Sequence, residues 1–322
     1  MAHPLRIGQL KGHESRVFDA RFGGTEGNCV ASVGADKRLL LWRRDGPDHG
    51  NATWRKAATL TGAHDSEITR VEWHSSGGRV FSGGADGRVC IWDASLAAAE
   101  SNAAGMPTGI PTVPMATLEA SGEDEVYGLE CLTPEMLLVG TSEVIQQWDI
   151  EQRTCTRSLA LAPSAGAEVW GGSARNPDSK AFIFGVAARG RLAGAVLSDG
   201  TLRLIDAQEC KQLFVLDAHE AAAMSVCFSP TSQEFATTAT DGEVALWDMR
   251  TLGRGPRLRM RTGEHSIYCC SWMRDSILVT GSGRQSLAAL PTVSLLVTPR
   301  VCHTPCSPLI TCICAQIHAA GR

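Results

Sequence analysis

The strongest constraint on this chain is a four-residue pattern that recurs at three places with nearly fixed spacing. In each copy a His precedes an Asp by 22 or 23 residues, a Ser or Thr stands four residues before the Asp, and a Trp follows six residues after it. Internal repetition of this kind is typical of folds built from supersecondary units that pack against their neighbours along the chain. The three copies are His13, Ser32, Asp36 and Trp42; His64, Ser82, Asp86 and Trp92; and His219, Thr237, Asp241 and Trp247.

The residues that lead to each Trp predict short β-strands. The runs 39–42, 89–92 and 244–247 are apolar, and the last two follow the turn signals Asp86-Gly87 and Asp241-Gly242. An Asp in a tight turn can accept a hydrogen bond from a His, and a buried indole N–H needs a partner. Because the His, Ser or Thr, and Asp recur together with a Trp, we interpret them as structural tetrads and not as a hydrolase triad.

On these residues the sequence resembles the WD-repeat (WD40) family, whose repeats carry Gly-His near the start and Trp-Asp at the end. Gly12-His13, Trp92-Asp93 and Trp247-Asp248 match this signature, and the resemblance covers about residues 5–283. It implies an all-β fold, a β-propeller of four-stranded blades, in which each tetrad ties its own blade together. Residues 5–10 would then supply the outer strand of the last blade and close the ring.

Three further repeats are degenerate. One has a Ser in place of the Asp, and one has an Ile in place of the Trp. The last has an Arg in place of the Asp and a Leu in place of the Trp. We interpret these losses as drift, because packing between neighbouring blades carries most of the stability of such folds. Six repeats are detected, so the chain is either a six-bladed ring or a truncated seven-bladed one. The marks of these repeats are Ser142 and Trp148; Asp199 and Ile205; and His265, Thr280, Arg284 and Leu290.

The end of the chain does not continue the repeat. We predict a propeller over residues 1–290 and an irregular, disordered or aberrant tail over 291–322. A zinc site in this tail is the alternative, but its ligand spacing is not a usual one. We therefore expect no metal and no other cofactor. The residues that would have to form the site are Cys302, His303, Cys306, Cys312 and Cys314.

Composition excludes several classes of partner and activity. The chain of 322 residues has a net charge of −4 and no clustered Lys and Arg, so nucleic acid is not expected. No apolar stretch approaches the roughly 20 residues that cross a bilayer, and the N-terminus lacks the core of a signal peptide. We expect a cytoplasmic or nuclear protein. Because no nucleophile elbow, phosphate-binding loop or zinc-protease motif occurs, we expect no enzyme.

The surface predicted to bind partners is the mouth of the central channel. In the family, the residue at the start of each innermost strand points into this mouth and follows a small apolar residue. In the fourth repeat Val169-Trp170 is an alternative match, but counting back from Asp199 favours Phe182. The resemblance therefore implies a partner-binding role for Phe18, Thr69, Tyr127, Phe182, Met224 and Tyr268.

The chemistry of these positions suggests the kind of partner. The chain has only two tyrosines, Tyr127 and Tyr268, and both fall at the mouth. Aromatic side chains are favoured anchors of interfaces, and carboxylates near them favour a cation. Our hypothesis is a scaffold of a multiprotein complex that binds partner peptides through a Lys or Arg; the alternative is that the aromatics only fill the strand starts. The nearby acidic residues are Glu67, Glu123, Asp124, Glu125 and Glu168.

A second functional hypothesis rests on the opposite face. The segment Trp247–Arg250 resembles the WDxR box of substrate receptors in cullin–RING ubiquitin ligases, in which Arg250 would contact the adaptor protein. The long connections 43–57 and 94–115 are expected on this bottom face. Their length and composition are more typical of flexible spacers than of binding sites.

Overall fold

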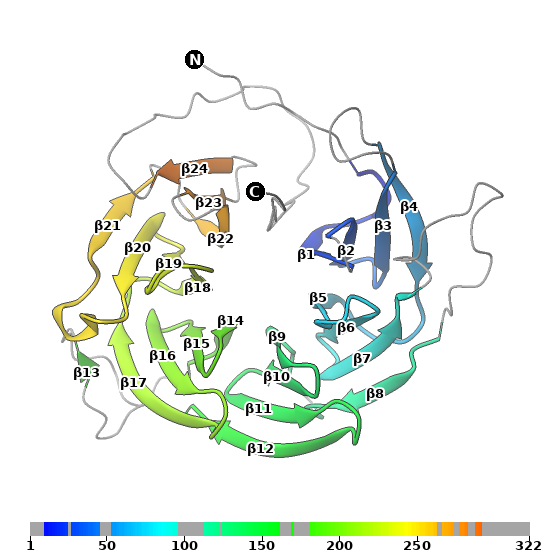
Figure 1. Ribbon diagram of the computed structural model, residues 1–322, viewed down its shortest axis with the longest axis horizontal. Helices are drawn as coiled ribbons and strands as arrows, with labels where there is room; N and C mark the ends of the chain where they lie inside the picture. The colour runs from blue at the N-terminus through cyan, green and yellow to red at the C-terminus, as the bar shows by residue number, and fades with distance from the viewer. Residues whose placement is uncertain are drawn as a thin grey trace.

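The strands of the computed structural model form six sheets around a common axis (Figure 1). Five contain an antiparallel blade of four strands, one of them with a short fifth strand at its outer edge, and the sixth sheet has three described strands. The prediction of an all-β propeller of four-stranded blades is confirmed, and each detected repeat corresponds to one sheet. The structure describes residues 10–24, 27–45, 53–95, 113–122, 124–161, 169–170, 181–262, 266–273, 277–282 and 287–291.

Each blade begins at the channel and adds its strands outward in chain order. Blades one and two contain β1 (Val17–Gly23), β2 (Cys29–Gly34), β3 (Leu39–Asp45), β4 (Thr53–Leu60), β5 (Ile68–Trp73), β6 (Arg79–Gly84), β7 (Arg88–Asp93) and β8 (Ala116–Glu119). Blades three and four contain β9 (Gly128–Thr133), β10 (Met136–Gly140), β11 (Val144–Asp149), β12 (Thr154–Ala160), β14 (Ile183–Arg189), β15 (Leu192–Leu197), β16 (Thr201–Asp206) and β17 (Lys211–Asp217). Blades five and six contain β18 (Ala223–Phe228), β19 (Glu234–Ala239), β20 (Glu243–Asp248), β21 (Leu258–Arg261), β22 (Ile267–Met273), β23 (Ile277–Ser282) and β24 (Leu287–Pro291).

Two short elements complete the described part of the chain. A 3-10 turn, η1 (Leu252–Arg254), lies between β20 and β21. The strand β13 (Val169–Trp170) pairs in parallel with the outer strand β17 of blade four. Val169 and Trp170 therefore do not begin an innermost strand, as expected from the spacing to Asp199.

The turn between the second and third strands of a blade explains the Asp-Gly signals. Gly87 has a φ of +75°, a conformation that residues with a side chain rarely adopt. A Cβ at Gly87 would also lie 2.2 Å from the carbonyl oxygen of Ser121. The Asp86-Gly87 pair therefore allows β6 to turn tightly into β7 while the next segment passes close to it.

Most of the core lies between blades, although one cluster around Leu40 and Trp42 belongs to blade one alone. Leu39 and Leu41 of blade one share a buried cluster with Ile68 and Val71 of blade two. Equivalent clusters join each later pair of neighbours as far as the sixth sheet. This arrangement explains why a blade can lose its tetrad: the apolar faces of its neighbours still bury it.

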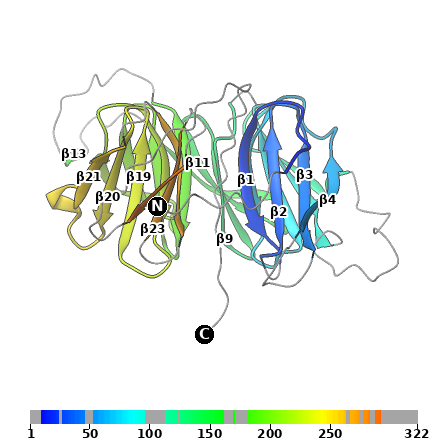
Figure 2. The same cartoon turned by 90° about the horizontal axis from the view of Figure 1, so that it is seen from above.

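The two faces of the ring are set by strand direction. Innermost strands such as β1 and β9 run from one face to the other (Figure 2). The mouth residues and the tetrad turns therefore share one face, and the ends of the third strands lie on the other. Residues 5–9 and 292–322 lie outside the described residues, so ring closure and the tail stay predictions. Among the described residues, no helix has the length and apolar character to span a bilayer.

Candidate functional site

The tetrads of blades one and two form internal hydrogen-bond chains. In blade one the indole N–H of Trp42 donates to Ser32 Oγ at 2.8 Å, and Ser32 Oγ lies 2.8 Å from His13 Nε2. His13 Nδ1 lies 2.9 Å from Asp36 Oδ2. Because Ser32 accepts from Trp42, its own proton can go to His13 Nε2, which leaves the Nδ1 proton for Asp36. The set is satisfied internally and has no free nucleophile.

Blade two repeats this chain with nearly the same distances. Ser82 Oγ lies 2.8 Å from both Trp92 Nε1 and His64 Nε2, and His64 Nδ1 lies 3.0 Å from Asp86 Oδ1. Ser82 has no exposed surface. Although burial opposes it, hydrogen bonds from His64 and from two backbone amides lower the pKa of Asp86. The carboxylate is therefore held charged inside the blade.

Blade five differs from the prediction at one position. His219 Nε2 lies 2.8 Å from Thr237 Oγ1, which accepts the indole N–H of Trp247 at 3.0 Å. His219 Nδ1, however, lies 3.6 Å from a carboxylate oxygen of Glu243. Asp241 instead accepts the backbone N–H of Glu243 at 2.9 Å. The acid that faces the His in this blade is therefore Glu243, two residues after the predicted one.

Blade three satisfies its Trp by another route. The indole N–H of Trp148 donates to Gln146 Oε1 at 2.9 Å, and Gln146 Nε2 donates to the carbonyl of Ala120 at 2.8 Å. A single glutamine on the third strand thus takes over the role of the Ser and His. Ser142, which stands in the Asp place, is left on the turn at the mouth.

The mouth positions coincide with a β-bulge at the start of the innermost strands. Ile68 pairs with Gly84 and Arg70 with Gly83, so Thr69 between them bulges from the ladder. The register shifts in the same way at three other predicted residues, Phe18, Met224 and Tyr268.

In blade four the bulged residue is Phe184, so the prediction of Phe182 for this register was wrong. Ile183 pairs with Leu197 and Gly185 with Val196. A sequence signal for the correct register existed. The bulged residue comes directly after one buried apolar residue and two positions before another. Thr69 stands in this way between Ile68 and Val71. Ile183 and Val186 flank Phe184 in the same way.

The predicted mouth residues differ in their exposure. Thr69 is 7% exposed and its hydroxyl donates to the carbonyls of Gly83 and Val126, so it is buried where blades two and three meet. Phe18 lies under the guanidinium of Arg16, 5.9 Å from the ring centroid. Tyr268 is 37% exposed.

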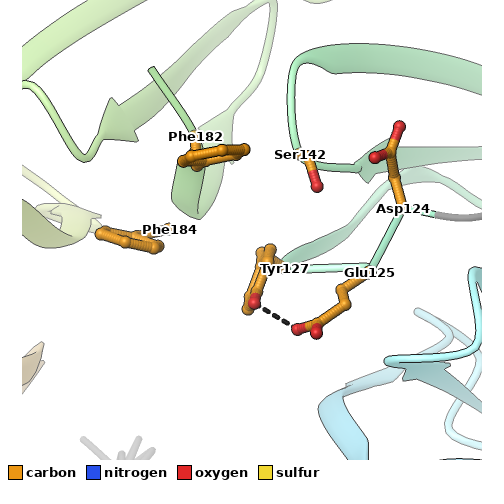
Figure 3. Close-up of a pocket in the computed structure, with 6 residues that line it drawn as sticks. All are labelled: Asp124, Glu125, Tyr127, Ser142, Phe182 and Phe184. Atoms are coloured by element: carbon orange, nitrogen blue, oxygen red, sulfur yellow. Dashed lines mark hydrogen bonds between the residues drawn. The ribbon is translucent and has the colours of Figure 1, made fainter. Parts of the chain in front are cut away.

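Tyr127 and Phe182 do meet in one pocket. The pocket has a volume of about 280 Å³ and lies where blades three and four adjoin (Figure 3). The rings of Tyr127 and Phe184 stand at 83° with their centroids 6.0 Å apart, and Phe182 is 41% exposed. The pocket is lined by Asp124, Glu125, Tyr127, Ser142, Phe182 and Phe184.

An arginine of blade two holds the backbone of this pocket. Arg70 Nε donates to the carbonyl of Tyr127 at 2.7 Å, and its Nη2 donates to the carbonyl of Phe184 at 2.6 Å. The blades also approach closely here, because a Cβ at Gly128 would lie 2.4 Å from Cγ2 of Val186. Contacts within the protein therefore hold the two aromatic walls in place before any ligand binds.

The pocket is acidic on one side. Asp124 and Glu125 lie opposite the two phenylalanines, with Tyr127 between them (Figure 3). The hydroxyl of Tyr127 donates to Glu125, and burial together with Glu125 raises the pKa of Tyr127. The phenol therefore stays protonated and keeps its ring against the opening. Glu67 is not part of the lining, and Glu123 and Glu168 lie outside the described residues.

The innermost strands β1, β5 and β9 carry further carboxylates. Arg21 Nε lies 3.8 Å from carboxylate oxygens of both Asp19 and Glu72. Burial raises the pKa of Glu72 to about 7, and burial with the charge of Glu72 raises the pKa of Glu130 to about 8. Glu72 keeps 17% of its side-chain surface exposed, so water in the channel still reaches this group.

Arg250 lies on the opposite face from the pocket. It follows β20, and its guanidinium contacts both carboxylate oxygens of Asp248, at 2.9 and 2.6 Å. The hydrogen bonds from Arg250 lower the pKa of Asp248 to about 2. The Arg250 side chain is nevertheless 73% exposed, so it remains accessible.

The described residues hold no group of three or more His, Cys, Asp or Glu side chains that could bind a metal ion. The cysteines and histidine of the predicted tail, Cys302 to Cys314, lie outside the described residues.

Comparisons with known proteins bear on both the fold and the function. The sequence model of the family described as "WD domain, G-beta repeat" matches residues 54–93 and 210–248. The chain is 24% identical over 260 residues to the ribosome biogenesis protein WDR12 homolog of Chlamydomonas reinhardtii, covering 76% of the chain and 56% of that protein. It is 24% identical over 294 residues to the nuclear distribution protein PAC1 of Arthroderma otae, covering 85% and 58%.

Two further matches differ in kind. A stretch of 84 residues is 34% identical to human DDB1- and CUL4-associated factor 5, covering 26% of the chain and 9% of that protein. The crystal structure of RRP9 WD40 repeats superposes with a TM-score of 0.67 at 16% identity, covering 88% of this chain and 78% of that one.

The chain spans a little over half the length of the first two relatives. None of these names denotes an enzyme, in agreement with the expectation of a non-catalytic protein. The blades, the tetrads and these matches together show that the chain belongs to the WD40-repeat β-propeller family.

Proposed function

We propose that this protein is an interaction scaffold and that the pocket between blades three and four binds a basic side chain of a partner peptide. The observation that carries the proposal is the meeting of three aromatic residues and two carboxylates in one pocket of about 280 Å³. This volume is below the range usual for cofactor and drug-sized sites, and it suits a single side chain. The aromatic faces and the carboxylates both attract a cation.

The names of the relatives support a role in multiprotein assemblies. They refer to ribosome biogenesis, nuclear distribution and association with DDB1 and CUL4. For this chain such a role, with protein partners in the cytoplasm or nucleus, is a proposal that rests on the pocket and on these similarities.

The test is affinity capture from cell extract, read by mass spectrometry, with the full chain and with the double variant Tyr127→Ala, Phe182→Ala. We expect the variant to lose a defined set of partners because it removes two walls of the pocket. Phe214→Ala is the matched control, since Phe214 is an exposed aromatic of the outer strand β17 and does not line the pocket. Retention of every partner by the double variant would contradict the proposal.

A second candidate function is that of a substrate receptor of a cullin–RING ubiquitin ligase. It is favoured by the exposure of Arg250 and by the 34% identity to DDB1- and CUL4-associated factor 5 over 84 residues. We expect the chain to co-precipitate DDB1 and Arg250→Ala to abolish this association. Arg191→Ala is a matched control, because Arg191 is 62% exposed and pairs with Asp206, which ends the third strand of blade four as Asp248 ends that of blade five.

A further inference from the structure

We propose that the pocket between blades three and four selects a methylated lysine side chain over unmodified lysine and over arginine. This inference rests on the proposed function, because it names the basic side chain that the pocket takes. It is drawn from the angle between two aromatic walls and from the separation of the apolar and acidic sides of the opening.

The angle between the rings distinguishes a compact cation from a flat one. The planes of Tyr127 and Phe184 stand at 83°, and their centroids are 6.0 Å apart. A planar guanidinium can stack on one ring at a time, so only one of two perpendicular faces can be used. A methylated ammonium is compact in every direction and can lie in the corner between both faces, within reach of each ring.

Hydration favours the methylated form over plain lysine. Phe182 and Phe184 present no hydrogen-bonding groups, so an ammonium that enters between them loses water contacts without replacement. Each methyl group replaces one strongly hydrated N–H with apolar surface that the rings can bury. Phe182 is 41% exposed, so its ring is open to such a contact.

The acidic side predicts the degree of methylation. Asp124 and Glu125 lie across the opening from the phenylalanines (Figure 3). A dimethylammonium keeps one N–H that can donate to a carboxylate while its methyl groups face the rings. A trimethylammonium has no N–H to donate. We therefore expect dimethyl-lysine to bind best.

The rigidity of the walls supports discrimination between such similar groups. Arg70 fixes the carbonyls of Tyr127 and Phe184, and the N–H of Phe182 donates to Ser198 Oγ at 2.8 Å. Walls that are positioned in advance cannot close around a ligand of another shape at low cost. Shape differences between cations are then expressed as differences in affinity.

The experiment uses the full chain and fluorescein-labelled Gly-Gly-Lys-Gly-Gly peptides with zero, one, two or three methyl groups, and the arginine peptide. Binding is measured by fluorescence anisotropy and located by NMR shifts of the Tyr127 and Phe184 amides. We expect the dimethyl-lysine peptide to bind at least about tenfold more tightly than the unmodified and arginine peptides. Phe182→Ala and Asp124→Asn should each weaken it, whereas Phe214→Ala, which removes an exposed aromatic from the outer strand β17, should not.

Three results would overturn the inference, and the first two differ in what they say of the proposed function. Equal or tighter binding of unmodified lysine or arginine at the same amides would reject selection for methylation and leave a general basic-residue pocket. Absence of shifts at Tyr127 and Phe184 with every peptide would reject both proposals. A neutral peptide with a tert-butyl group in place of trimethylammonium separates charge from shape: binding as tight as that of the dimethyl-lysine peptide would overturn recognition of a cation.

Discussion

Blades two and three are neighbours, yet they satisfy the same buried Trp in different ways. Blade two uses a chain of four side chains that ends on the turn carboxylate of Asp86. Blade three uses Gln146 alone, which bridges Trp148 to a backbone carbonyl. Both blades share apolar clusters with their neighbours on each side. The internal chain is therefore one of several ways to satisfy the indole, and interblade packing is the common requirement.

The difference has a consequence at the mouth. In blade two the turn Asp is bound to His64 and the bulged residue, Thr69, is buried under blade three. In blade three the turn carries Ser142, and Tyr127 immediately precedes β9; both line the pocket. The regular blade closes its mouth end with internal hydrogen bonds, whereas residues at the mouth ends of the drifted blades three and four line the pocket.

The largest test of this comparison is Ser82→Ala. The substitution leaves the buried indole of Trp92 and His64 without their shared partner, and we expect a loss of about 2–4 kcal/mol in the free energy of unfolding. The measurement is urea denaturation followed by tryptophan fluorescence. Ser82→Thr is the control, since Thr237 performs the same role in blade five. A loss below about 1 kcal/mol for Ser82→Ala would show that the hydrogen-bond chain of the tetrad is dispensable even in a blade where it is complete.

A smaller effect is expected for Gln146→Ala in blade three. Trp148 is 8% exposed and Gln146 is only partly buried, so water can replace the lost amide. We expect a loss of about 1 kcal/mol by the same urea measurement. A loss equal to that of Ser82→Ala would remove the contrast between the two blades.

The smallest effect concerns pH. The pKa of Glu130 is raised to about 8 in the folded protein, above the ordinary value of 4.5. Between these two values the folded state holds a proton that the unfolded state has released, so the unfolding free energy falls as the pH rises through this window. Glu130→Gln should flatten this dependence and raise the Tm at pH 9 by roughly 2 °C. Melting curves from pH 5 to 9 test it, with the exposed Glu135→Gln as control; parallel curves for Glu130→Gln and the unsubstituted chain would contradict it.

These contrasts also show how far the sequence could be interpreted. The spacing of Ser82, Asp86 and Trp92 predicts a blade because these side chains form one hydrogen-bond chain of fixed geometry through His64. The spacing from Asp199 misplaced the mouth residue of blade four, because the hairpin between β14 and β15 differs in length from those of the regular blades. The apolar residues on either side of Phe184 would have given the correct register.

Other features depend on contacts between blades that no local pattern reports. Thr69 is predicted at the mouth, but its hydroxyl donates to Val126 of the next blade. Glu243 faces His219 although Asp241 stands at the family position. Arg70 lies in a strand of blade two, and only the folded ring shows that it binds the carbonyls of Tyr127 and Phe184.

The pocket draws its walls from two blades, and this couples its occupancy to the integrity of the seam between them. Any opening that separates β9 from β14 parts Tyr127 from Phe184 and must release the ligand first. By mass action, a ligand present at 100 times its Kd disfavours that opening by about 2.7 kcal/mol. A partner bound there would stabilise the contact between blades three and four. Hydrogen exchange of the buried amides on either side of this contact would then slow in proportion to the concentration of the partner.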